Sequence, residues 1–366
     1  MKGKKRVDLI LLFVTFMLVG IGIVMVYSTS AIIANERFGD PFYFLKRQAF
    51  FAGVGFLLMF LFMFFPYELF KRLAYPIFLL SLLLLILVLI PGIGYRAGGS
   101  MRWIRLGGYS FQPSELAKLG LVIFLAYLLT KKEEKIRSFF FGFLPVVLFS
   151  GLLIGLIMKE PDFGTALFLI IIVFLLLFIS GARVIYLVSA FLIAIPLVYA
   201  FLMSAEYRYK RWIGFIRPWE DPTGSSFQII QSFLSFGSGG LFGQGLGEGR
   251  QKLFFLPAPH TDFIFSIIGE ELGLIGAMAV LLLFFILTFR GIQIALSLQE
   301  RFACYLALGV TLMISLQSII NMGVVLGLLP TKGLTLPFIS YGGTSLVANL
   351  MGMGILLHLS SHVERR

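Results

Sequence analysis

Several ionisable side chains of this sequence lie at the edges of long apolar runs, where a charge is costly and is therefore a candidate for function. Asp262 opens one such run, in the segment PHTDFIFS, and Ser266 and Glu270 follow at i+4 and i+8. That spacing predicts three polar side chains on one face of a helix. Asp262 is either the N-cap of this helix or a functional carboxylate. A cap alone would not explain the polar stripe that follows it.

A charged pair and a second aspartate occur in similar settings. Glu115 and Lys118 share a helix face, because they lie three residues apart after Pro113, a residue suited to the first helical turn. They form an ion pair that holds the helices together or they line a polar cavity, and the two roles are compatible. Asp162, in the segment EPDFGT, is either a helix N-cap or a carboxylate that lines a cavity.

Basic side chains in these and neighbouring segments are candidate anion ligands, since Arg and Lys are the usual partners of a diphosphate. The candidates are Arg102, Arg105, Lys118, Arg208, Lys210 and Arg211. The cluster at 208–211 fits an anchor for lipid headgroups equally well. His260 could carry a proton, but a histidine beside a helix start more often forms only a hydrogen bond.

The elements that must position these residues are membrane helices. Of the 366 residues, 59% are hydrophobic and only 13% are charged, whereas a soluble protein has about 25% charged residues. The mean hydropathy is +0.97. Many apolar runs have the length of about 20 residues that crosses a bilayer, and they do not alternate as the strands of a porin do. The sequence predicts an all-α polytopic membrane protein with a single domain over 1–366.

Ten membrane-spanning helices are expected, and this even number places both termini on the same side. Their ranges are 9–28, 48–65, 73–91, 113–130, 139–158, 163–180, 184–203, 263–289, 302–326 and 341–359. The first run is longer than the apolar core of a signal peptide, so we expect it to remain as an uncleaved span. We see no internal repeat of the kind that transporters carry.

The distribution of positive charge orients this bundle. With cytoplasmic termini, the inner segments carry 15 Lys and Arg, against eight in the short outer loops, as the positive-inside rule requires. The outer connections are also longer and more polar, so we expect the working face to be extracytoplasmic. The longest of them, 204–262, is expected to hold two amphipathic helices, at 207–219 and 226–236, and then a flexible glycine-rich turn at 237–249.

Other classes of function are excluded by what the sequence lacks. The single cysteine, Cys304, cannot form a disulfide within the chain, and three scattered histidines cannot form a zinc cage. We find neither a Walker A loop nor a dinucleotide-binding fingerprint. The net charge of +12 fits contact with anionic lipid and membrane topology, so no nucleic acid partner is expected.

Four segments together resemble the signature segments of one family, the SEDS proteins of shape, elongation, division and sporulation. The segments are 112–118, 161–165, 256–273 and 329–345. They occur in the order that the family has, and the likeness extends over essentially the whole chain. The segment TKGLTLP at 331–337 looks closer to the family's division and sporulation members than to its elongation member.

This resemblance implies a peptidoglycan glycosyltransferase with ten membrane helices. Such enzymes polymerise lipid II at the outer face of the bacterial cytoplasmic membrane and hold undecaprenyl-linked glycan. Their partners are a class B penicillin-binding protein and other division or elongation proteins. Carried over by motif, the family's essential acidic residue is Asp262, and its polar pair is Glu115 and Lys118.

The candidate residues suit this chemistry. A diphosphate is already a good leaving group, so one carboxylate that deprotonates the acceptor hydroxyl is sufficient as a base. Lys and Arg, with Mg²⁺ or Mn²⁺ on the phosphate oxygens, can neutralise the leaving group, and no organic cofactor is expected. Two alternatives are a lipid II flippase and a scaffold that recruits a penicillin-binding protein. The gathering of polar residues toward the outer face favours the enzyme.

Overall fold

The helices of the protein follow the apolar runs of its sequence. The computed structural model describes residues 7–97, 100–203, 206–222, 224, 226–252, 259–331 and 333–363. A helix occupies each of the ten ranges expected to span a membrane. These helices are α1 (Leu9–Phe38), α2 (Tyr43–Phe64), α4 (Ala74–Leu89), α5 (Pro113–Lys131), α6 (Leu144–Lys159, preceded by a π-helical turn at Phe139–Phe143), α7 (Phe163–Ile179), α8 (Val184–Met203), α11 (Ile264–Ser297), α12 (Arg301–Val325) and α13 (Gly343–Ser360).

Seven of the described helices are long and apolar enough to cross a membrane. They are α1, α2, α5, the continuous segment Phe139–Lys159, α11, α12 and α13. The apolar helices α4 and α7 are shorter, and α8 contains Pro196. Local signals set several helix starts: Asp8 caps α1 by accepting the N–H groups of Ile10 and Leu11, and Pro113 opens α5.

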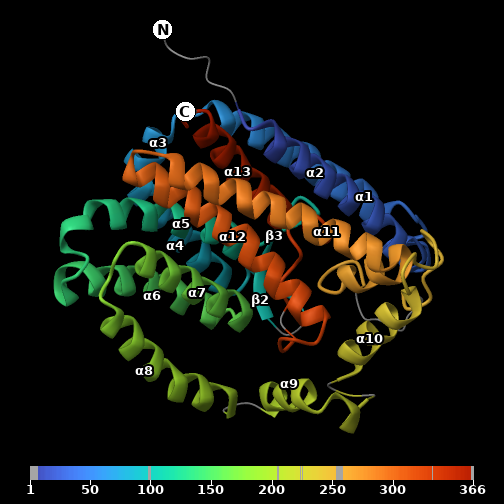
Figure 1. Ribbon diagram of the computed structural model, residues 1–366. Coiled ribbons are helices and arrows are strands. Elements are labelled where there is room, and N and C mark those ends of the chain that lie inside the picture. Colours follow the sequence, from blue (N-terminus) through green and yellow to red (C-terminus); the bar gives the residue numbers. More distant parts are fainter. Residues whose placement is uncertain are drawn as a thin grey trace.

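Three helices form the centre of the bundle, and α8 lies at its edge. In α5 and α13, 83% of the apolar window is buried inside the protein. Helix α13 packs on α2, and α12 packs on α11 and α5. Figure 1 shows α8 and α9 (Glu206–Ile216) as an arm along the lower edge, away from this centre. Helices α5, α12 and α13 are therefore central, and α8 is peripheral.

The two ends of the described chain lie at the same end of the bundle (Figure 1). The backbone N–H of Asp8 donates to the Ser360 hydroxyl at 2.9 Å, and the carboxylate of Asp8 forms an ion pair with Arg290. These contacts join α1, α11 and α13. An even number of membrane crossings gives such an arrangement.

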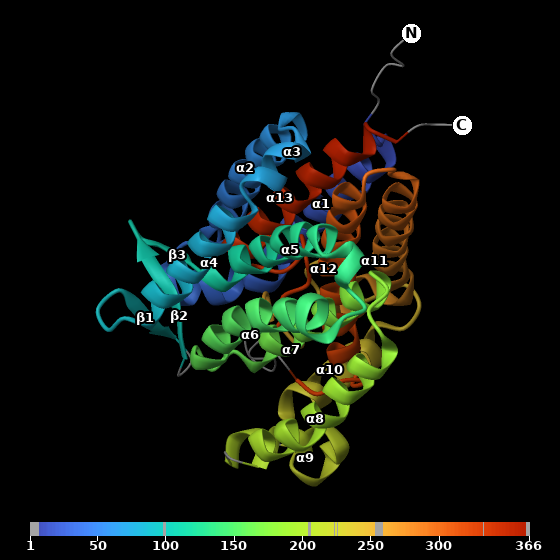
Figure 2. The same ribbon diagram turned by 90° about the vertical axis from the view of Figure 1, so that its left-hand side faces the viewer.

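A small antiparallel sheet lies at one edge of the bundle, on the left in Figure 2. Its strands are β1 (Gly94–Ala97), β2 (Ser100–Leu106) and β3 (Tyr109–Phe111), in that order. Gly107 and Gly108 connect β2 to β3 with φ of 53° and 86°. Two consecutive positive φ angles define the tight hairpin turn that twisted strands prefer, and glycine adopts them without strain.

The segment between α8 and α11 contains the two expected amphipathic helices, α9 and α10 (Phe227–Gly239). The turn after α10 is largely exposed, but part of it packs closely on α11. A Cβ at Gly243 would lie 2.2 Å from the carbonyl oxygen of Glu271. Helix α11 is broken at Gly273, and Leu274 and Ile275 there donate to the carbonyls of Gly240 and Leu241. The glycine-rich turn thus satisfies backbone groups that the break would leave unpaired.

Candidate active site

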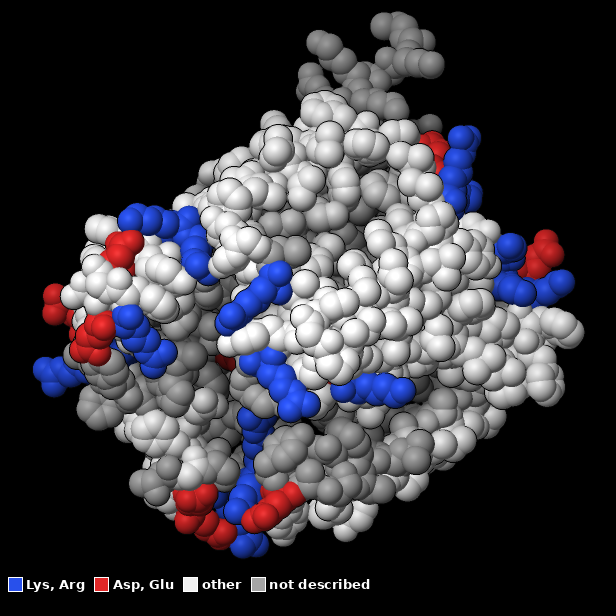
Figure 3. Space-filling model, turned by 180° about the vertical axis from the view of Figure 1, so that it is seen from behind, with Lys and Arg blue, Asp and Glu red and all other residues white. Residues whose placement is uncertain are grey.

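A cavity of ≈ 1110 Å³ brings together residues from distant parts of the chain. Its walls come from α2, β2, the start of α5, the turn before α7, α9 and the loops at 260–263 and 330–345. Among the described residues, three cations line it: Arg47, Arg102 and Arg211. Figure 3 shows Lys and Arg side chains gathered around a hollow on the rear face of the molecule. The cavity is therefore suited to an anionic ligand that also carries polar groups.

Asp262 lines this cavity and is not the N-cap of α11. The helix begins at Ile264, its capping residue is Phe263, and no side chain caps it. The backbone carbonyl of Asp262 accepts a hydrogen bond of 2.8 Å from the Asn321 amide. Burial and, secondarily, the charge of Asp162 raise the pKa of the Asp262 carboxyl to about 6, while Arg102 and Arg211 oppose the shift. Asp262 is thus ionised at neutral pH but is more basic than an ordinary aspartate.

Asp162 takes both roles that the sequence left open. Its carboxylate caps α7 by accepting the backbone N–H of Thr165 at 3.2 Å and the Thr165 hydroxyl at 2.9 Å. It also lines the cavity and lies 3.8 Å from the guanidinium of Arg102. Arg102 donates to the carbonyls of Glu160 and Pro161. The turn before α7 therefore fixes one cation of the cavity in place.

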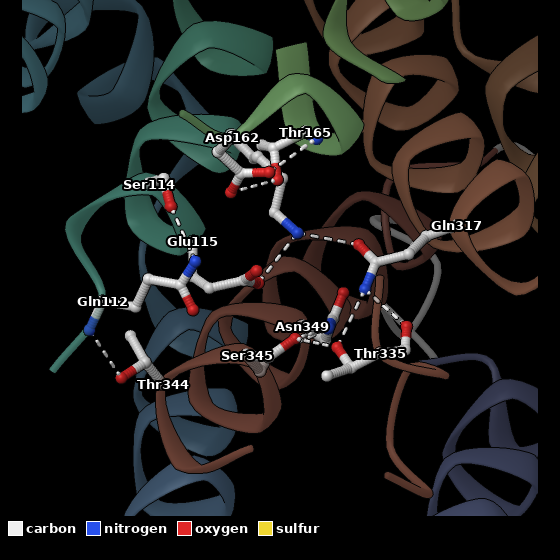
Figure 4. Close-up of polar contacts among 11 residues, drawn as sticks. Gln112, Ser114, Glu115, Asp162, Thr165, Gln317, Thr335, Thr344, Ser345 and Asn349 are labelled. Carbon is white, nitrogen blue, oxygen red and sulfur yellow. Dashed lines mark hydrogen bonds and ion pairs between the residues drawn. The ribbon is translucent and has the colours of Figure 1, made fainter. Parts of the chain in front are cut away.

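Glu115 takes both roles, whereas Lys118 forms the ion pair but does not line the cavity as expected. The ammonium of Lys118 is 2% exposed and lies 2.8 Å from Glu115 Oε2, and Glu115 lines the cavity. Lys118 also donates to Gln317 Oε1 at 2.8 Å, and the Gln317 amide donates to the Thr335 carbonyl at 2.8 Å. Figure 4 shows Glu115 from α5 and Gln317 from α12 converging from opposite sides. One buried cation thus connects two helices and the loop that forms the cavity wall.

His260 lies in the cavity wall beside Asp262. Its ring packs against Phe44 and Tyr341, with centroid distances of 4.6 and 5.6 Å. Burial, and secondarily the charge of Arg37, lowers the pKa of His260 to about 4. The imidazole is therefore neutral at pH 7, and its buried Nδ1 has no hydrogen-bond partner among the described residues, which differs from the hydrogen bond expected there.

Three expected cations lie elsewhere or outside the described side chains. Arg105 is exposed, and its guanidinium stacks 3.6 Å from the Tyr95 ring centroid. It does not line the cavity, whereas Arg102 and Trp103 of the same strand do. Lys210 is also outside the cavity and pairs with Glu206 at 2.7 Å on the exposed face of α9. The side chain of Arg208 lies outside the described part of the structure.

The polar stripe expected after Asp262 does not form, because α11 begins only at Ile264. Ser266 is fully buried, and its hydroxyl donates to the carbonyl of Phe263 at 2.7 Å. Glu270 accepts the N–H groups of Arg250 and Gln251 at 2.7 and 3.2 Å, beneath the glycine-rich turn. Neither Ser266 nor Glu270 lines the cavity, and the placement of Glu270 indicates a structural role.

Sequence reasoning missed four residues of the site. Gln317 and Asn321 are amides one helical turn apart within an apolar run, and that position was itself a signal of function. Arg47 lines the cavity from α2. Glu160 is fully buried, and burial together with the neighbouring charge of Asp162 raises its pKa to about 8. No local pattern distinguishes Arg47 or Glu160 from other charges beside a helix.

The fold and the cavity together define a class: a multi-pass helical membrane protein with a buried, charged cavity between its helices. The chain belongs to the family of FtsW, RodA and SpoVE, whose model, described as cell cycle protein, matches residues 9–365. This confirms the resemblance to the SEDS proteins found in the signature segments.

Individual relatives match the chain over nearly its full length. It is 47% identical over 363 residues to a probable peptidoglycan glycosyltransferase FtsW of Geobacter sulfurreducens, covering 99% of this chain and 97% of that one. It is 46% identical over 361 residues to stage V sporulation protein E of Bacillus subtilis, covering 98% of each.

Two solved structures share its fold. The rod shape determining protein RodA of Thermus thermophilus has a TM-score of 0.72 and 33% identity, covering 98% of this chain and 99% of that one. A chain from a peptidoglycan synthase complex that coordinates polymerization and crosslinking has a TM-score of 0.80 and 33% identity, covering 97% and 98%.

Proposed function

We propose that this protein is a peptidoglycan glycosyltransferase that polymerises lipid II into β-1,4 glycan and releases undecaprenyl diphosphate, in cell division. The relatives with FtsW in their names carry the same activity in those names. The observation that carries the proposal is the position of Asp262, a carboxylate in a cavity that Arg102 and Arg211 also line. A base and cations beside one another are what transfer from a diphosphate donor needs.

In the proposed reaction Asp262 accepts the proton of the acceptor's 4-hydroxyl. The freed oxygen attacks the anomeric carbon of the donor, and the bond from that carbon to the diphosphate oxygen breaks. The electron pair leaves with undecaprenyl diphosphate, whose charge Arg102 and Arg211 neutralise. A single displacement of this kind inverts the α-linked donor to a β-linked product. The raised pKa of Asp262, about 6, lies close enough to neutrality for an effective base.

A divalent cation is part of the proposal only as a companion of the substrate. Among the described residues, no group of three His, Cys, Asp or Glu side chains could hold a metal ion by itself. Mg²⁺ and Mn²⁺ commonly bind through one or two carboxylates and the phosphates of a substrate. Asp162, on the cavity wall, could share such an ion with the diphosphate. The ion would add positive charge at the leaving group.

The proposed topology has ten membrane spans, cytoplasmic termini and an extracytoplasmic 204–262 segment in the bacterial cytoplasmic membrane. The excess of basic residues in the inner segments and the adjacency of Asp8 and Ser360 support it. The proposed partner is a class B penicillin-binding protein, because a similar chain belongs to a complex that combines polymerization with crosslinking.

The proposal is tested by incubating the purified protein with lipid II, with and without its transpeptidase partner, and by analysing the products for glycan polymer. Glycan formation supports the enzyme. Transfer of lipid II across vesicle membranes without polymer would instead support a flippase. If the protein shows neither activity, the scaffold alternative is favoured.

A further inference from the structure

The proposed reaction involves two lipid-linked molecules, and each carries a diphosphate. The cavity must therefore hold two diphosphates at once, and Arg102 and Arg211 can account for the one that leaves. The inference that follows rests on the proposed function and concerns the third cation of the cavity. We propose that Arg47, held by Tyr43 and Tyr109, binds the diphosphate of the acceptor lipid II.

Several contacts hold the Arg47 side chain in a position from which it can bind a ligand. It extends from α2 into the cavity wall and donates to the carbonyl of Gly108 at 3.2 Å. Its guanidinium lies 4.5 Å from the ring centroid of Tyr43 and 5.4 Å from that of Tyr109. These contacts set the plane of the guanidinium but use only part of its five N–H donors. A preorganised fork of this kind suits the oxygens of a diphosphate.

Arg47 lies at a different end of the cavity from Arg102. The two are separated along strand β2, since Arg102 lies near its start and Arg47 contacts Gly108, just beyond its end. The backbone of the five residues from Arg102 to Leu106 spans about 14 Å at the rise of a strand. The two cations are therefore suited to separate diphosphates.

The chemistry of the reaction determines which diphosphate lies at which end of the cavity. In the donor, the diphosphate is attached to the carbon under attack, so it must lie beside Asp262, where Arg102 and Arg211 are. In the acceptor, the attacking hydroxyl and the diphosphate are at opposite ends of a disaccharide. When that hydroxyl reaches Asp262, the acceptor's diphosphate lies a disaccharide's length away. Among the described residues, Arg47 is the cavity cation that lies toward the other end of β2 from Arg102.

A phospholipid headgroup offers the same phosphate chemistry, so the experiment must separate the two sources. The full-length protein is reconstituted in phosphatidylcholine vesicles with and without phosphatidylglycerol. A labelled lipid-linked glycan oligomer is supplied at saturation as donor, and lipid II is varied as acceptor. The rate of elongation gives KM for lipid II and kcat separately. The matched control is Lys46→Gln, because Lys46 is the neighbouring cation but is 68% exposed, pairs with Asp40 and does not line the cavity.

Loss of the charged hydrogen bonds in Arg47→Gln should raise KM for lipid II about ten- to a hundredfold in both vesicle types, with kcat retained. Arg47→Lys keeps the charge but loses the forked pair of donors, so it should raise KM for lipid II less. If Arg47→Gln lowers the thermal stability, the test uses Arg47→Lys instead. An unchanged KM would overturn the proposal. A rise in KM confined to vesicles with phosphatidylglycerol would also overturn it, because it would assign Arg47 to a phospholipid. A fall in kcat alone would overturn it as well. Absence of polymer from the wild-type protein would instead refute the proposed function itself.

Discussion

The ammonium of Lys118 lies 2.8 Å from the side-chain oxygen of Gln317, a residue on another helix and 199 positions away. The same ammonium pairs with Glu115, so the cation is held from both sides. Gln317 continues to the Thr335 carbonyl in the cavity wall. The ion pair and the wall of the candidate site are therefore parts of one network, and changes to the pair should reach the site.

Removing one partner of this pair should be more harmful than removing both. Glu115→Gln or Lys118→Met alone leaves an uncompensated buried charge, which costs about 3–5 kcal/mol. The double variant should regain most of that stability, which thermal unfolding in detergent measures. If the pair also serves the reaction, the double variant will fold but will not polymerise lipid II. A folded and fully active double variant would limit the pair to a structural role.

Asp262→Asn and Asp262→Ala should abolish polymerisation and leave the fold intact. Asp262 does not cap α11, so neither change removes a helix cap, and the loss of about 0.5–2 kcal/mol expected for a cap should be absent. Glycan synthesis and thermal stability are measured on the same preparations. Near-normal synthesis by either variant would exclude Asp262 as the base.

The rate should depend on pH through the ionisation of Asp262. Because its pKa in the folded protein is about 6, the rate should fall about tenfold per pH unit below that value, as the base becomes protonated. Because the pKa is raised above its ordinary value, ionisation of Asp262 lowers the free energy of unfolding. This loss is complete above about pH 6. Asp262→Asn should therefore stabilise the protein more at pH 7.5 than at pH 5. Glu160→Gln removes the second raised pKa, about 8, and should leave the change near pH 6 in place.

The glycine-rich turn should tolerate a side chain at one position and not at another. Gly243 and Gly247 both have positive φ, 82° and 87°, so alanine is strained at each. Only at Gly243 would the new Cβ meet backbone, at 2.2 Å from the carbonyl oxygen of Glu271, whereas nothing lies within 4 Å at Gly247. Gly243→Ala should therefore lower the thermal stability more than Gly247→Ala. Equal losses would show that the packing of the turn on α11 contributes little.

The proposed topology predicts which side of the membrane each exposed loop faces. Glu248 and Glu134 are both exposed, and each is replaced by cysteine in a Cys304→Ser background. A membrane-impermeant thiol reagent should label position 248 in intact spheroplasts, and position 134 only after the membrane is permeabilised. The reverse pattern would place Asp262 on the cytoplasmic side and would end the polymerase proposal.

The sequence by itself determined the ten helical ranges and the adjacency of Glu115 and Lys118, and it offered capping as one of two roles for Asp162. Each of these follows from residues within a few positions of one another, since apolar length, helical spacing and capping act locally. The expected stripe of Asp262, Ser266 and Glu270 failed because Asp262 lies two residues before the start of α11 and is not part of the helix.

Only the tertiary structure decided which charges share the cavity. Asp262, Arg102 and Arg47 come from a loop, a strand and a helix that are distant in sequence, and the packing of α5, α12 and α13 brings these elements together. The same packing turned Glu270 toward the glycine-rich turn and gave Lys118 its second partner, Gln317. Such contacts depend on how whole helices pack against one another, and no local pattern of residues encodes that arrangement.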